Sequence, residues 1–66
     1  MILTMATDPE FREILQLSLT QITSMRDAMR QMRLIAISGV VKELLDSQIK
    51  DATAKMAEIE RRIAEL

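Results

Sequence analysis

Apolar side chains recur at alternating intervals of four and three residues along two separate stretches of the chain. Residues at these intervals fall on one side of an α-helix, so each stretch predicts a helix with one apolar stripe. In the first stretch only Ser18 interrupts the apolar pattern, and the second continues to the last residue. The first stripe contains Phe11, Leu15, Ser18, Ile22, Met25, Met29, Met32 and Ala36, and the second contains Leu45, Ile49, Ala52, Met56, Ile59, Ile63 and Leu66.

The boundaries of both helices can be placed from single residues. Asp8, or Thr7 together with Glu10, suits a helix N-cap, and Pro9 suits the first helical position. Ser38 precedes Gly39, which is the one glycine of the chain and a natural place for a backbone conformation that other residues avoid. We therefore expect one domain over residues 1–66, with an N-terminal segment 1–8 and helices over about 9–37 and about 40–66.

A reversal near Gly39 fits the phase of the two stripes better than one unbroken helix does. Ala36 and Leu45 are nine residues apart, which is about two and a half helical turns, so the stripes of a single rod would face opposite sides. In an antiparallel hairpin they face each other. The predicted fold class is all-α, a helical hairpin of two long helices.

A hairpin of 66 residues has little core of its own, and the chain contains neither cysteine nor histidine for disulfides or a structural zinc site. We expect self-association, a dimer first and a tetramer as the alternative, into a four-helix-type bundle. In size and two-helix plan this resembles the small dimeric RNA-binding hairpin bundles of plasmid copy control, and no motif carries a function over from them. The predicted core and self-interface residues are Leu15, Ile22, Met25, Met29, Met32, Leu45, Ile49, Met56, Ile59 and Ile63.

Charges are placed as a hairpin would need them. Folding about Ser38 or Gly39 brings residues whose numbers sum to roughly 76 or 77 to about the same height, and four such pairs have opposite charges. Acid-before-base pairs at four-residue spacing also recur within the second helix. The expected cross-hairpin pairs are Arg33–Glu43, Arg30–Asp46, Arg26–Asp51 and Glu13–Arg62, and the expected pairs within the second helix are Asp46–Lys50, Asp51–Lys55 and Glu58–Arg62.

The residues offer little for catalysis or cofactor binding. Without histidine and cysteine, the chain lacks the side chains most used for proton transfer, nucleophilic attack and soft-metal binding at neutral pH. One glycine cannot form a phosphate-binding loop, and bundle di-metal sites use histidine. We expect no enzyme activity, no cofactor and no metal site.

Two surface features suggest partners. Arg26, Arg30 and Arg33 form a basic stripe that could contact phosphates, although the net charge of −1 and the absence of Tyr and Trp make nucleic acid the weaker candidate. The expected hairpin tip is apolar, which indicates burial in an oligomer or a docking surface for a partner. The tip residues are Leu34, Ile35, Ile37, Val40 and Val41. The role of the apolar segment 1–6 stays open.

No apolar run approaches the roughly 20 residues of a membrane span, and the N-terminus lacks the basic region of a secretion signal, so we expect a cytoplasmic protein. The leading hypothesis is a non-enzymatic protein–protein interaction module, such as an adaptor, small chaperone or regulatory subunit, that acts as a self-associating hairpin. The alternatives are a nucleic-acid-binding regulator that uses the basic stripe and a subunit of a larger hetero-coiled-coil assembly.

Overall fold

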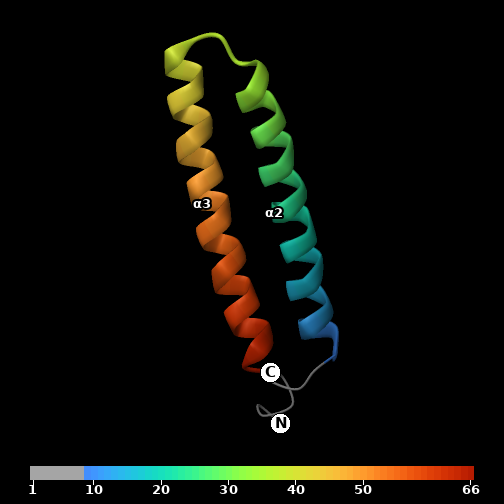
Figure 1. Cartoon of the computed structure of the whole chain (residues 1–66). Helices are drawn as coiled ribbons and strands as arrows, with labels where there is room; N and C mark the ends of the chain where they lie inside the picture. The colour runs from blue at the N-terminus through green and yellow to red at the C-terminus, as the bar shows by residue number, and fades with distance from the viewer. Residues whose placement is uncertain (1–8) are drawn as a thin grey trace.

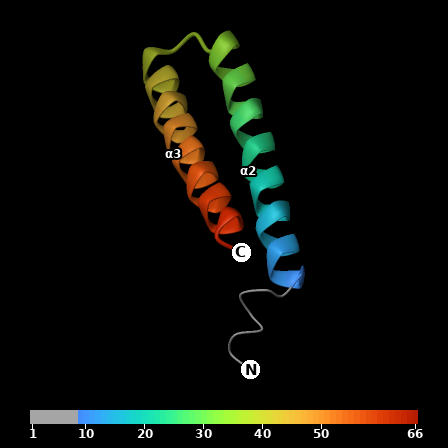
Figure 2. The same ribbon diagram turned by 60° about the horizontal axis from the view of Figure 1, so that its bottom comes forward.

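Two long antiparallel helices make up the structure, a computed structural model that describes residues 9–66 (Figure 1). Helix α2 runs over Pro9–Ile35 and helix α3 over Gly39–Ala64. They lie side by side along most of their length in both views (Figure 2). The predicted all-α hairpin is confirmed. The N-terminal segment 1–8, with the expected cap at Thr7 or Asp8, lies outside the described residues.

Helix α2 begins at Pro9, as the sequence predicts, and ends two residues before the expected Ile37. Pro9 needs no hydrogen-bond partner for its backbone nitrogen, and Glu10 in the first turn opposes the positive end of the helix dipole. Arg33 occupies the last turn, where a cation is favoured.

The connection between the helices is set by Ser38. Its backbone is extended (φ −70°, ψ 131°), and its Oγ accepts a hydrogen bond of 3.5 Å from the backbone N–H of Val41. The Ser38 carbonyl accepts the first helical bond, from Lys42 N–H at 3.0 Å. Ser38 is therefore the N-cap of α3. Gly39 is its first helical residue and has no positive φ, so the expectation of a special glycine conformation is wrong.

Helix α3 ends in a turn rich in ion pairs. Arg61 bonds Glu58 at 2.7 Å and Glu65 at 3.1 Å, and Arg62 bonds Glu58 at 3.2 Å. Cations in the last turn also complement the helix dipole. Of the three pairs predicted within this helix, Glu58–Arg62 is confirmed, whereas Asp46–Lys50 and Asp51–Lys55 are absent from the described part of the chain.

The contact between the helices buries little. Within residues 9–66 only Leu45 and Ala52, both on α3, are buried. The Cα atoms span 53 × 14 × 14 Å with a radius of gyration of 15.5 Å. A compact chain of this length would have about 11 Å. Two helices in contact along one side each leave most of their surface exposed.

Neither described helix is long and apolar enough to cross a membrane.

Candidate protein interaction surface

Eight of the ten predicted core residues lie between the two helices, and two do not. Leu45 is buried. The half-buried ones are Leu15, Ile22, Met29, Ile49, Met56, Ile59 and Ile63. Met25 and Met32 remain 61% and 49% exposed, so the contact within one hairpin does not cover them.

Arginines occupy the places between the helices where these two methionines were expected. The side chains of Arg26 and Arg33 are 19% and 37% exposed, respectively. An arginine can lie with its aliphatic stem against apolar surface while its guanidinium reaches water. The inner side of α2 therefore follows Ile22, Arg26, Met29 and Arg33, also at intervals of four and three. Spacing and polarity do not indicate this arrangement, because arginine is charged and the predicted stripe contains only small or apolar residues.

The displaced methionines belong to a second apolar stripe of α2, which we call the outer stripe. Its large members, Ile14, Leu17, Met25, Met32 and Ile35, are between 49% and 79% exposed. Exposed Gln21 and Ala28 complete the spacing of three and four residues. At about 100° per residue, the outer stripe points about 100° away from the inner side of α2. The charged residues between Ile14 and Ile35 all lie at least about 120° from it.

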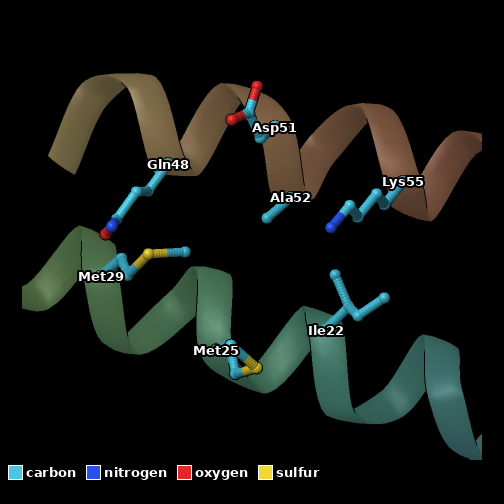
Figure 3. Close-up of a pocket in the computed structure, with 7 residues that line it drawn as sticks. All are labelled: Ile22, Met25, Met29, Gln48, Asp51, Ala52 and Lys55. Carbon is cyan, nitrogen blue, oxygen red and sulfur yellow. The ribbon is translucent and has the colours of Figure 1, made fainter. Parts of the chain in front are cut away.

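A shallow groove of about 470 Å³ borders the outer stripe at mid-length (Figure 3). Ile22, Met25 and Met29 of α2 line it with Gln48, Asp51, Ala52 and Lys55 of α3. The close-up places Met29 across from Gln48, Met25 across from Ala52 and Ile22 across from Lys55. Each of these pairs sums to 77, as the predicted register requires. Met25 of the outer stripe thus shares one face of the hairpin with Asp51 and Lys55.

The closed end of the hairpin exposes the five predicted tip residues, four of them by more than three quarters. Ile37, in the connection, is 94% exposed, and Leu34, Ile35 and Val40 are between 76% and 79% exposed. Val41, which is 45% exposed, is flanked by Leu44 at 56%. The structure therefore brings the tip residues together as one exposed apolar end.

The basic stripe is largely engaged by carboxylates. Arg26 bonds its neighbour Asp27 at 3.0 Å, and Arg33 bonds Asp46 across the hairpin at 2.8 Å. Arg30 is exposed and forms no ion pair within residues 9–66. None of the four predicted cross-hairpin pairs occurs in this range. Equal height alone does not fix a partner, because a long arginine side chain reaches along the helix as well as across to the next one.

One carboxyl group has a perturbed proton affinity. Hydrogen bonds from Arg61 and then Arg62 lower the pKa of Glu58 below its usual range. The same contact with Glu58 raises the pKa of Arg61. All three side chains are exposed, so these shifts mark surface ion pairs at the end of α3.

Groups for metal binding are missing from the described residues, in which no three Asp, Glu, His or Cys side chains cluster closely enough to hold an ion. No known protein family, curated protein or solved structure matches the chain.

Proposed function

We propose that this protein is a non-enzymatic protein–protein interaction module that works as a self-associating helical hairpin. The observation that carries the proposal is the exposure of ten large apolar side chains within residues 9–66, where two residues are buried. Exposed apolar surface of this extent marks sites of association.

Energetics favour association over a lone hairpin. Covering one large apolar side chain contributes about 1.5–3 kcal/mol. The outer stripe alone offers five such side chains, Ile14, Leu17, Met25, Met32 and Ile35. Their burial in a bundle would add a term comparable with the whole stability of a small domain, which is about 5–15 kcal/mol.

The exposed tip supports a second part of the proposal, an adaptor, small-chaperone or regulatory-subunit role. Ile37 lies in the connection between the helices and Val40 in the first turn of α3, and both are largely exposed. A second hairpin packed along the sides leaves this end accessible. The tip is thus the surface that the assembled module would present to a different protein.

The nucleic-acid alternative has less support. Two of its three arginines already bind carboxylates, and a guanidinium engaged in this way must first be released before it contacts phosphate. Arg30 remains as a single unpaired cation of the stripe within the described residues.

Light scattering after size exclusion, combined with circular-dichroism melting at several protein concentrations, tests the proposal. We expect a helical species of twice the 7.5 kDa chain mass, with a tetramer as the alternative, whose melting temperature rises with concentration. A stable helical monomer would refute self-association. A poorly helical monomer would refute it too and would favour the hetero-coiled-coil alternative.

A further inference from the structure

The outer stripe of α2 is symmetric about its own midpoint. Its large apolar residues pair by number, Ile14 with Ile35 and Leu17 with Met32, and each pair sums to 49. Gln21 and Ala28 form the third pair with the same sum. The midpoint lies between Ser24 and Met25. Two copies of this helix laid antiparallel along the stripe would therefore bring large apolar residues opposite each other at both ends of a span of about 32 Å, with Gln21 opposite Ala28 between them and Met25 beside Ser24 at the midpoint.

Helix α3 carries charges placed for the same symmetry. Facing residues of the two helices have numbers that sum to 77. The midpoint of the outer stripe, between residues 24 and 25, is therefore level with residues 52 and 53 of α3. Asp51 and Lys55 stand on either side of that level, on the same face as Met25. Neither is in an ion pair within residues 9–66. A two-fold axis at this height would bring Asp51 of each copy to Lys55 of the other.

From these two coincidences we infer that the occupant of this face is a second copy of the chain, docked antiparallel about a two-fold axis through the level of Ser24 and Met25. In this dimer α2 packs against α2 of the partner along the outer stripe, and α3 lies beside α3. The inference rests on the proposed function and adds to it the docking face and its orientation.

The exposed area is sufficient for such an interface. The chain has an accessible surface of 5311 Å², whereas a compact monomer of 7.5 kDa has about 4,200 Å². The excess of about 1,000 Å² is spread over the whole surface of the hairpin, and a stable interface would cover roughly 800 Å² on one face of it.

Parallel docking on the same face fits less well. It would set α2 against α3 of the second copy, so Ile14 and Leu17 would lie at the level of residues 60 to 63 of the second copy's α3. In each chain Arg62 lies in that stretch and is bonded at 3.2 Å to Glu58, one helical turn away. Covering this pair with apolar side chains removes water from both charges. Antiparallel docking instead places Ile14 against Ile35 and Leu17 against Met32.

Single cysteines test the orientation, since the chain has none of its own. A disulfide requires Cα atoms within about 7 Å. We expect Met25→Cys to cross-link to itself under mild oxidation, because the axis passes beside it. Ile14→Cys and Ile35→Cys should each stay uncross-linked alone and should cross-link when mixed. Arg30→Cys, on the opposite side of α2, is the control that should not react with itself.

The solution mass of the reduced variants separates the two proposals. A dimeric mass without the cross-links at Met25 and between Ile14 and Ile35 would overturn antiparallel docking and leave self-association standing. A monomeric mass would overturn both.

A charge at the axis provides a second test that does not depend on oxidation. Met25 is exposed in the single hairpin, so Met25→Glu should leave helicity intact and raise the dimer dissociation constant by about 100-fold. Gln16→Glu, on the far side of α2, is the matched control and should leave dissociation unchanged. Equal dissociation constants for both variants would overturn the inference.

Discussion

Arg33 and Asp46 connect the two helices close to the closed end of the hairpin. The Nε–H of Arg33 donates a hydrogen bond of 2.8 Å to Oδ1 of Asp46, and it is the cross-hairpin ion pair found within residues 9–66. Arg33 lies on the inner side of α2, where Met32 was expected. The same side chain thus occupies a place between the helices and forms an ion pair with Asp46.

Removing this pair should have a small, salt-dependent effect, because both side chains reach water. We expect Arg33→Gln to lower the free energy of unfolding by about 0.2–1 kcal/mol in urea titrations at low salt, and by less at high salt. Arg30→Gln is the matched control, since Arg30 has no ion pair within residues 9–66. An equal loss in both variants would contradict a specific Arg33–Asp46 contribution.

Ser38→Ala removes the N-cap of α3. Loss of a serine cap costs about 0.5–2 kcal/mol, and the 3.5 Å bond from Val41 N–H places the expected loss in the lower half of that range. Ser47→Ala, at an exposed site within α3, should be neutral or slightly stabilising because alanine has the higher helix propensity. Urea denaturation of the two variants measures the difference. If Ser38→Ala were as stable as Ser47→Ala, the assignment of Ser38 as the N-cap of α3 would be wrong.

Gly39→Ala should stabilise the protein. Gly39 is helical, its φ is not positive and a Cβ atom there would meet nothing within 4 Å. Alanine restricts the unfolded chain without straining the folded one, so we expect a gain of about 0.4–1 kcal/mol in the free energy of unfolding. A loss of stability would indicate the left-handed turn conformation that the sequence alone suggested.

Ile49→Asp should dissociate and unfold the protein together. Ile49 is half-buried between the helices, where an unpaired carboxylate loses hydration without gaining a partner. We expect a loss of about 3 kcal/mol or more, seen as lower helicity and a monomeric mass. The neighbouring exposed Lys50→Asp is the control and should remain folded. If the Ile49→Asp variant remained a folded oligomer, the assignment of Ile49 to the core would be contradicted.

Glu58 should make stability sensitive to acid. Because Arg61 and Arg62 lower its folded-state pKa below the unfolded value, its contribution is fully present above the unfolded pKa and is lost as pH falls through the folded one. We expect the melting temperature of Glu58→Gln to fall less than that of the unmodified protein when pH decreases from about 5 to 3. Glu60→Gln, at a carboxyl outside the ion pairs of the described residues, is the control and should follow the unmodified protein. If the melting temperatures of Glu58→Gln and the unmodified protein fell equally with pH, the predicted contribution of Glu58 to acid sensitivity would be contradicted.

The sequence by itself determined the two helices, the reversal between them and the register that sets Met25 across from Ala52. Apolar residues at intervals of four and three define one side of a helix, Pro9 marks where the first helix begins and Ser38–Gly39 marks the reversal, so these features depend on local and periodic information.

Only the tertiary structure decided which of two adjacent stripes on α2 faces α3. Met25 and Arg26 are both compatible with the spacing, and so are Met32 and Arg33. In the structure the arginines take the less exposed positions, since their side chains are 19% and 37% exposed while their guanidiniums reach Asp27 and Asp46. That choice left the methionines outside, on a stripe with no charges. Which stripe faces α3 depends on how the surfaces of the two helices fit together, and the spacing of residues along the sequence does not determine this fit.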